Sequence, residues 1–442
     1  MRRALVVAAL VFAACTATPG ASSPSPSLAA SPSVTVVTIR ATGSLVRSDV
    51  ARAAADPEAA KRAARATAAL GADLYAQLIT ERRNLVFSPY SIAVALAMTR
   101  DGAAGMTADE MDKVLHASLI GDVDRGFNSL DQALAKRPGS YPGGFGAGGQ
   151  QQATLELSTA DRLFGQRGFE FGVPYLDRIA TYYGAGVGIV DYINATEDAR
   201  KAINSWVSDQ TRARIPELVP TGVLNGLTRF ALVNAIYLKA QWTKPFSAAR
   251  PAPFHRLDGS TVQASLMGSS GFSYARYGKG SGYQAMTASY VGGLSMVVIV
   301  PDAGAFGSFE KGLDGGRLGA VLDGLAPAAV ELQMPKFQFR SPSPLKETLS
   351  RLGMPTAFSD RADFSAISPR ERLVLQDALH EAFISVDEKG TEAAAATGAF
   401  GGVTSGPNEI IQLTVDRPFL FLIRDDETGA ILFMGRVLDP TA

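Results

Sequence analysis

The chain has 442 residues, of which 46% are hydrophobic and 19% are charged, so it can bury a sizeable core in one large domain or two ordinary ones. It carries 42 basic and 42 acidic residues, and this balance gives no general reason to expect nucleic acid or a charged surface as a partner. The single cysteine excludes an intramolecular disulfide.

Residues 1–14 have the features of a signal peptide. Arg2 and Arg3 precede an apolar run over residues 4–14 that is too short to cross a bilayer as an uncleaved helix. The sequence Phe12-Ala-Ala-Cys15 resembles a bacterial lipobox, although Phe12 stands where leucine is more usual. Acylation of Cys15 would make the protein an exported lipoprotein, held at the extracellular side of a membrane. The alternative is an ordinary cleavage site with an incidental thiol.

The segment that follows is predicted to be a flexible tether. Residues 15–67 are rich in Ser, Pro and Ala and poor in large apolar side chains, so they cannot repay the entropy of folding. The Ala- and Arg-rich residues 50–66 can already be helical. We expect a single folded domain over residues 68–442.

The predicted elements of this domain are helices first and then strands interrupted by helices. Apolar residues recur at helical spacing over 68–79, and Ser88-Pro89 is typical of a helix start. Residues 230–242 are apolar on both faces, as expected of a strand at the centre of a sheet. Other strands are predicted at residues 155–164, 294–300, 330–339, 409–415, 419–424 and 431–437, and a helix at 199–211. Because strands and helices do not alternate regularly, the predicted class is α+β.

A glycine-rich stretch matches a nucleotide-binding motif in letters only. Gly144, Gly146 and Gly149 have the spacing of a dinucleotide fingerprint, but no strand is predicted before them. Residues 137–150 are therefore predicted to be a flexible loop.

No motif in the chain indicates catalysis or metal binding. The three histidines do not form a His-Glu-x-x-His pair, and Gly-x-Ser-x-Gly and a Walker loop are absent. His116 is predicted to close a helix as a dipole partner, and His255 is predicted to face solvent. No catalytic residue, metal or cofactor is expected, although a Ser-His-Asp triad of distant residues would leave no spacing signal.

The most informative stretch is residues 383–405. It begins as a strand, with aromatic and β-branched residues, and past Gly390 it loses almost all bulk and charge. At a period of two, one face is small and uncharged throughout, whereas Glu392 falls on the other face. The small face consists of Thr391, Ala393, Ala395, Thr397, Ala399 and Gly401. Such a segment can slide between two strands without burying a charge; the alternative is a helix or a flexible linker.

This stretch resembles the reactive-loop hinge of serpins, the suicide-substrate protease inhibitors. The match is to the inhibitory form of the hinge, over Glu388-Lys-Gly-Thr-Glu-Ala-Ala-Ala-Ala-Thr397. Other serpin-like segments are Asn84-Leu-Val-Phe-Ser-Pro-Tyr-Ser91 with residues 102–107, Asn234 to Phe246, and Val415-Asp-Arg-Pro-Phe-Leu-Phe-Leu-Ile423. The resemblance covers residues 68–442. It implies three β-sheets, eight or nine helices and an exposed reactive loop at about residues 388–410.

The resemblance also assigns roles to particular residues. The hinge comprises Glu388, Gly390, Thr391, Glu392, Ala393, Ala394, Ala395, Ala396 and Thr397. Ser88, Ser91, Asn234 and His380 correspond to the polar "shutter" beneath the opening point of the main sheet, and Trp242 corresponds to the "breach", where the loop first enters. The alternatives are a core histidine bonded to one carbonyl and an ordinarily packed tryptophan.

The function implied is inhibition of a serine protease, which cleaves the loop and is trapped as an acyl-enzyme when the loop inserts into the sheet. The family's hinge-to-bond length places the cleaved bond at Thr404–Ser405. These residues and Val403 are small and uncharged, which favours elastase-like or subtilisin-like targets, and Phe400 allows a chymotrypsin-like cut. Apart from its covalent protease complex, the protein is expected to be a monomer that reaches a membrane only through its lipid.

Two alternatives to inhibition come from different functional classes. The first is a non-inhibitory serpin fold that acts as a surface-binding lipoprotein; the uncharged hinge argues against it. The second is a secreted hydrolase, for which no motif argues.

Overall fold

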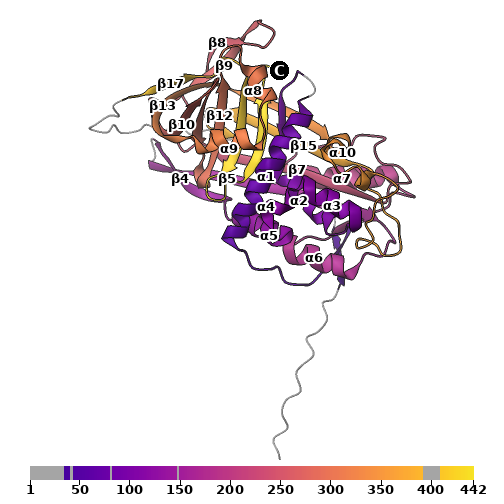
Figure 1. Cartoon of the computed structure of the whole chain (residues 1–442). Helices are drawn as coiled ribbons and strands as arrows, with labels where there is room; N and C mark the ends of the chain where they lie inside the picture. The colour runs from indigo at the N-terminus through magenta and orange to yellow at the C-terminus, as the bar shows by residue number, and fades with distance from the viewer. Residues whose placement is uncertain (1–33, 40–42, 80–81, 147–148, 392–408) are drawn as a thin grey trace, which may run out of the picture. The chain divides into compact units, whose positions relative to one another are not determined.

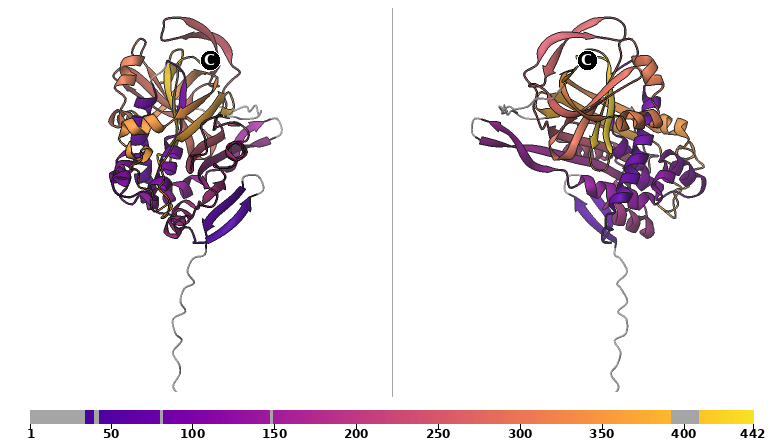
Figure 2. Two further views of the ribbon diagram at one scale, coloured as in Figure 1. Left: turned by 90° about the vertical axis from the view of Figure 1, so that its right-hand side faces the viewer. Right: turned by 60° about the vertical axis from the view of Figure 1, so that its left-hand side comes forward.

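The computed structural model describes residues 34–39, 43–79, 82–146, 149–391 and 409–442. These residues form ten α-helices and two β-sheets in mixed order, which confirms the predicted α+β class. The α-helices are α1 (Pro57–Leu78), α2 (Pro89–Arg100), α3 (Gly105–Val114), α4 (Ala117–Ile120), α5 (Val123–Leu134), α6 (Val173–Tyr183), α7 (Thr196–Gln210), α8 (Phe306–Lys311), α9 (Gly315–Asp323) and α10 (Lys346–Leu352). Figures 1 and 2 show α1 to α5 gathered together at one side of the sheets.

The main sheet has nine strands among the described residues. They are β1 (Val34–Ile39), β2 (Gly43–Ser48), β4 (Gly139–Gly146), β5 (Gly149–Gln166), β6 (Val187–Val190), β7 (Phe230–Gln241), β14 (Phe337–Pro344), β15 (Ala378–Asp387) and β16 (Gly390–Thr391). The order is β1-β2-β6-β5-β7-β16-β15-β14, and β4 pairs with β5. The long strand β7 lies inside this order, as its apolar character on both faces predicted.

The second sheet has ten strands among the described residues. They are β3 (Leu85–Phe87), β8 (Arg250–His255), β9 (Thr261–Gly268), β10 (Ser273–Gly280), β11 (Tyr283–Ser289), β12 (Leu294–Pro301), β13 (Ala326–Pro335), β17 (Ile411–Thr414), β18 (Phe419–Asp425) and β19 (Ile431–Val437). One half of β13 pairs with β10 and the other half with β9. Because β13 joins these ladders, the described strands form two continuous sheets where three were expected. The described residues also form ten α-helices, where eight or nine were expected.

Two apolar cores cover opposite faces of the main sheet. Alternate side chains of β7, among them Val233, pack with Ile203 and Val207 of α7. The side chains between them, such as Leu232 and Ile236, join the larger core that includes α1 and α2. This alternation follows from the period of two in a strand, and it directs Asn234 toward the α2 side.

The fold begins earlier in the chain than the sequence predicted. Strand β1 pairs with β2, and β2 pairs with β6 at the edge of the main sheet. Helix α1 starts at Pro57, where the Asp56 carboxylate accepts hydrogen bonds from the first backbone N–H groups. Buried alanines of α1, among them Ala60 and Ala63, belong to the larger core. The tether boundary at residue 67 is therefore corrected: small alanine side chains build a buried helix that a search for large apolar residues misses.

The glycine-rich stretch is also corrected. Residues predicted to be a flexible loop form β4 and the start of β5, which pair as an antiparallel hairpin with an irregularity between Pro142 and Phe145. Glycine provides no side-chain alternation, so the sequence carried no strand signal there.

No helix in the described ranges is both long enough and apolar enough to cross a bilayer.

Candidate functional site

Trp242 follows β7 directly and holds the turn that leads into the hinge. Its indole ring stacks on Tyr290 with 4.0 Å between ring centroids, and Phe246 packs edge-on against it at 5.5 Å. The indole N–H donates a hydrogen bond to the carbonyl of Asp387 at 2.8 Å. The backbone N–H of Trp242 donates to the carbonyl of Lys389, also at 2.8 Å. Trp242 therefore joins the end of β7 to the turn between β15 and β16.

Two residues of the predicted hinge already form a strand. Gly390 and Thr391 make up β16, which lies between β7 and β15 and runs antiparallel to both. Thr391 is level with Ala240 on β7 and with Val386 on β15. Its hydroxyl shares a hydrogen bond with the buried hydroxyl of Tyr290 at 2.7 Å. The start of the hinge is thus part of the main sheet.

The close approach of β7 requires glycine at position 390. A Cβ atom there would lie 2.1 Å from the carbonyl oxygen of Ala240 and 2.7 Å from the Cα atom of Gln241. In the turn before it, the Asp387 carboxylate accepts hydrogen bonds from the N–H groups of Lys389 at 2.8 Å and Gly390 at 3.2 Å. An aspartate that bonds to the backbone two and three residues later is a turn-forming device. These contacts set the direction in which the hinge enters the sheet.

Glu388 also holds the turn between β15 and β16 in place, through contacts with Phe246, Ala249 and Lys336. Its carboxylate accepts from the N–H of Ala249 at 3.0 Å and pairs with the ammonium of Lys336 at 2.9 Å. Its carbonyl accepts from the N–H of Phe246 at 2.7 Å. Since both charged groups are partly exposed, we assign Glu388 a positioning role rather than a large ionic stabilisation.

Beyond β16, strands β7 and β15 pair directly with each other. Five residues of each strand are paired in parallel, ending at Ile236 and Ala382. The strands then diverge to admit β16 at Ala240 and Val386. Each of these two residues lies four positions beyond the last direct pair. A strand that continued from Thr391 would therefore meet both neighbours in one register, without a slip.

The four predicted shutter residues meet in one hydrogen-bonded cluster. The N–H of Ser88 donates to His380 Nε2 at 3.0 Å, and His380 Nδ1 lies 2.5 Å from Asn234 Oδ1. The Asn234 amide donates to the Ser91 hydroxyl at 2.5 Å. The N–H of Ser91 donates to the Ser88 hydroxyl at 3.1 Å, which caps α2. All four residues are at most 2% exposed, so the cluster is fully buried between α2 and the sheet.

These contacts fix the protonation state of His380. Because Nε2 accepts from a backbone N–H, the ring proton is on Nδ1, which donates to Asn234 Oδ1. Burial lowers the pKa of His380 to about 3, so the imidazole is neutral. The core-histidine alternative, with one bond to a carbonyl, is not what the structure has.

Asp161 on β5 is a fifth member of the cluster that the sequence did not identify. Its Oδ1 accepts from the Ser91 hydroxyl at 2.8 Å and from the amide of Asn234. Desolvation raises the pKa of Asp161 to about 8. Asp161 is level with Asn234 in the β5–β7 ladder. Only the register of that ladder brings it to the shutter, and no motif in the sequence reports that register.

The cluster contains serine, histidine and aspartate side chains without forming a catalytic triad. His380 Nε2 is bonded to the backbone N–H of Ser88 and not to a hydroxyl. The hydroxyl of Ser91 donates to Asp161 directly. A triad needs the histidine between the nucleophilic hydroxyl and the acid. The hydrogen bonds of this cluster instead link α2, β5, β7 and β15 to one another.

The other two histidines lie away from the cluster. His116 has a left-handed backbone (φ 52°) just after α3, and its Nε2 lies 2.7 Å from the carboxylate of Asp73 on α1. The imidazole of His116 thus forms a hydrogen bond to a neighbouring helix, where a role as dipole partner at a helix end was predicted. His255 is exposed on β8, as predicted.

The remaining predicted site residues lie outside the described part of the chain. They are the hinge residues Glu392, Ala393, Ala394, Ala395, Ala396 and Thr397, the bond residues Phe400, Val403, Thr404 and Ser405, and Cys15. Their roles stay predictions.

A main sheet that already holds the start of a loop between two strands, above a buried polar cluster, defines a serpin-like architecture. The family model described as "Serpin (serine protease inhibitor)" matches residues 65–440. The leukocyte elastase inhibitor of Xenopus laevis is 35% identical over 368 residues, which are 81% of this chain and 93% of that protein.

Solved structures agree with this assignment. The native state of tengpin, a thermophilic serpin, matches with a TM-score of 0.74 and 26% identity over 88% of this chain and 96% of tengpin. Thyroxine-binding globulin in complex with thyroxine matches with a TM-score of 0.73 and 27% identity over 86% of this chain and 99% of the globulin. The chain belongs to the serpin family.

Proposed function

We propose that the protein is a suicide-substrate inhibitor of serine proteases that acts by loop cleavage, acyl-enzyme trapping and strand insertion. The observation that carries this proposal is β16, two loop residues seated between β7 and β15. Because two loop residues already lie between β7 and β15, further insertion would extend an opening that the sheet already has. The direct β7–β15 pairs beyond it are the bonds that must separate.

The register of the sheet supports continued insertion. A strand extending β16 would bring Ala395 level with Ala382 and Ile236, the last direct pair. Alanine is small enough to enter there without displacing the core packed beneath. Insertion through Gly401 would reach the first residue of β7. The cut predicted at Thr404 leaves enough chain for that.

The same register brings Thr397 between His380 and Asn234, which are now bonded to each other. A threonine hydroxyl can both donate and accept a hydrogen bond. When the strands separate, His380 and Asn234 lose their bond to each other. The Thr397 hydroxyl can then accept a hydrogen bond from His380 Nδ1 and donate one to Asn234 Oδ1. An alanine or valine at position 397 would leave two buried polar groups without partners.

Trapping follows from the distance that the attached protease travels. The protease serine attacks the carbonyl carbon of Thr404, the amine of Ser405 leaves, and an ester joins the two proteins. Insertion of about 13 residues beyond Thr391, at about 3.3 Å each, moves that ester by about 40 Å. We infer that this displacement distorts the protease before water can cleave the ester.

The proposed targets are elastase-like and subtilisin-like enzymes. Val403, Thr404 and Ser405 are small and uncharged, so they fit proteases with small apolar pockets and lack the cation that a trypsin-like pocket needs. Phe400 keeps a chymotrypsin-like cut in the proposal. The matched relatives named leukocyte elastase inhibitor support the elastase-like class.

We also propose that the protein is exported and held at a bacterial membrane by a lipid on Cys15. The apolar segment before Cys15 carries this part of the proposal. Metabolic labelling with a palmitate analogue in a bacterial host should label the protein and should fail to label the Cys15→Ser variant. Equal labelling of both would contradict it. In solution, the unlipidated domain is expected to be a monomer.

The central experiment is incubation with pancreatic elastase and, separately, with subtilisin. We expect an SDS-stable complex of the two proteins and, by mass spectrometry of the released fragment, a cut at or within a few residues of Thr404–Ser405. Trypsin serves as the control and should give no complex. The cleaved protein should melt at a clearly higher temperature than the intact one, since its loop has joined the sheet.

A binding function without inhibition is the alternative outcome. Thyroxine-binding globulin, whose structure is similar to this one, was solved in complex with thyroxine. Clean cleavage by elastase without a complex, and without a rise in melting temperature, would favour this alternative and contradict inhibition.

A further inference from the structure

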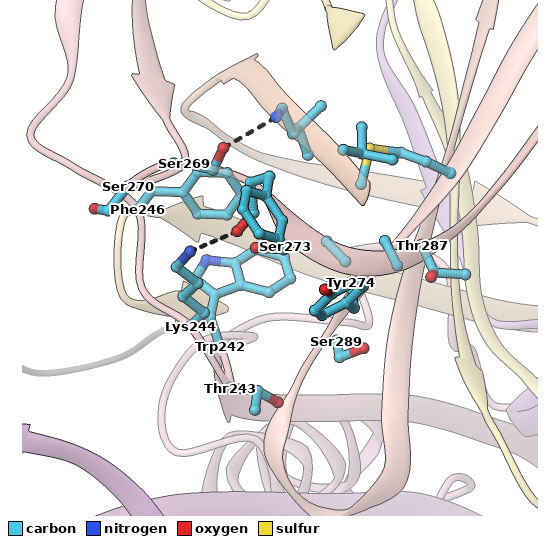
Figure 3. A pocket seen from close by; sticks show the side chains of 17 residues that line it. Trp242, Thr243, Lys244, Phe246, Ser269, Ser270, Ser273, Tyr274, Thr287 and Ser289 are labelled. Carbon is cyan, nitrogen blue, oxygen red and sulfur yellow. Dashed lines mark hydrogen bonds between the residues drawn. The ribbon is translucent and has the colours of Figure 1, made fainter. Parts of the chain in front are cut away.

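A pocket opens beside the breach, between the end of β7 and the strands β10, β11 and β13. Its volume is about 670 Å³, within the roughly 300–1,000 Å³ typical of small-molecule sites. Figure 3 shows the rings of Trp242, Phe246 and Tyr274 around it, together with Lys244. Its base is apolar, with Met286 and other aliphatic side chains from the strands. This is the composition of a ligand site rather than of a surface dent.

The mouth of the pocket carries aromatic rings that folding alone does not explain. Tyr274 is 72% exposed, although most large apolar side chains of the described residues are buried. It packs edge-on against Phe272 with 5.4 Å between centroids. Two adjacent aromatic rings at a pocket rim provide a surface on which an apolar ligand can pack.

The charge of the pocket has one sign. Among the described residues that line it, Lys244 is the only charged one and none is a carboxylate. The Lys244 ammonium donates to the carbonyl of Phe272 at 2.8 Å, which holds it at the pocket wall. Burial lowers the pKa of Lys244, and the charge of nearby Glu331 opposes that shift. Hydroxyl groups complete the polar part of the lining, among them those of Ser273 and Thr287.

We propose that this pocket binds a small amphipathic carboxylate, with the apolar body against Trp242, Phe246 and Tyr274 and the carboxylate beside Lys244. One cation within an apolar, acid-free lining is complementary to one anion on an apolar body. The proposal depends on the positive charge of Lys244, which coexists with its bond to Phe272. It is independent of protease inhibition, because the pocket residues other than Trp242 and Phe246 take no part in the hinge or the shutter described above.

Dodecanoate is the probe, and dodecan-1-ol is its uncharged match. The chain has two tryptophans, so a Trp206→Phe background leaves Trp242 as the only indole reporter in the pocket. Titration of the whole protein with dodecanoate should change Trp242 fluorescence in a saturable way. Dodecan-1-ol should bind at least about tenfold more weakly, since a hydrogen bond to a charged group is lost.

Two variants test separately how the charge and the shape of the pocket contribute to binding. Lys244→Gln should weaken dodecanoate binding at least about tenfold and leave dodecan-1-ol binding unchanged. Lys279→Gln is the matched control, because Lys279 is an exposed lysine on β10 that does not line the pocket. Ser273→Trp, which fills the pocket, should abolish binding of both probes while the melting temperature without probe stays close to that of the parent.

Three results would overturn the proposal. The first is no saturable signal with dodecanoate, and the second is equal affinity for acid and alcohol. The third is a Lys244→Gln variant that binds dodecanoate as tightly as the Lys279→Gln control. Formation of an SDS-stable elastase complex is a separate readout, so failure of the ligand site and failure of inhibition are distinguishable.

Discussion

Replacing Gly390 by alanine tests the strand on which the proposed mechanism rests. The added methyl group would lie 2.1 Å from the carbonyl oxygen of Ala240 and 2.7 Å from Gln241 Cα, both of them backbone atoms of the central strand β7. Backbone at the centre of a sheet cannot move aside cheaply. We therefore expect Gly390→Ala to withdraw β16 from the sheet rather than to shift β7.

The cost can be worked out from the contacts of β16. Withdrawal removes the bond from Trp242 N–H to the Lys389 carbonyl, the bond between Thr391 and Tyr290, and the main-chain pairing of Gly390 and Thr391 with their neighbours. At about 0.5–1.5 kcal/mol net for each bond, the loss of at least three hydrogen bonds lowers the free energy of unfolding of the intact protein by about 1.5–4.5 kcal/mol. At about 2 cal/mol/K of unfolding entropy per residue, the melting temperature of a domain of about 400 residues should fall by about 2–6 °C.

The assay is thermal unfolding at one fixed scan rate, followed by a gel assay with elastase. Gly319→Ala is the control, because a Cβ atom at that helix position of α9 meets nothing within 4 Å. It should leave the melting temperature the same or slightly higher. Gly390→Ala should also raise the fraction of inhibitor that is cleaved without trapping elastase. A variant that melts within 1 °C of the parent would refute the argument from close approach.

Three further predictions concern the hinge and the shutter. Thr391→Arg should lose most of its SDS-stable elastase complex, because a charge cannot be buried in the place that Thr391 occupies between β7 and β15, whereas the isosteric Thr391→Val should keep it; full yield from the arginine variant would contradict this. His380→Ala should lower the free energy of unfolding by about 2–5 kcal/mol in a urea titration, because the Ser88 N–H and Asn234 Oδ1 lose their partner, and a loss below about 1 kcal/mol would count against the network. Desolvation raises the pKa of Asp161 to about 8, above the value of about 3.9 in an unfolded chain. The native state therefore keeps a proton that the unfolded state releases, and stability should fall as pH rises from about 4 to about 8; Asp161→Asn should show a smaller fall, and identical pH profiles from urea titrations would contradict the assignment.

Long, strongly patterned strands could be predicted from the sequence. The buried run at residues 230–242 is β7, and the run at 431–437 is β19 with the same bounds. In both, apolar residues dominate between clear turns, so the local pattern and the tertiary packing agree. The run at 330–339 was predicted as one strand, but Lys336 separates β13 from β14, which belong to different sheets. A change of sheet within one apolar run has no local signal.

The shutter was predictable only in part. Ser88, Ser91, Asn234 and His380 came from the resemblance to a family, and the structure brings all four together. Asp161 lay in a segment predicted as a strand, but its partner across the ladder depends on register, which one sequence does not specify. Tyr290, which bonds Thr391, was missed for the same reason. Contacts between residues about 100 positions apart need the fold before they can be found.

The direct contact between β7 and β15 has an energetic consequence for this protein. These two strands run parallel over five residues of each, whereas β16 runs antiparallel to both. Each pair that a lengthening β16 separates would thus exchange one slanted ladder for two perpendicular ones, the slightly more stable kind per residue. At the centre of the intact main sheet, β7 and β15 are thus joined by the weaker, parallel type of pairing. Lengthening β16 would double the number of ladders between these two strands.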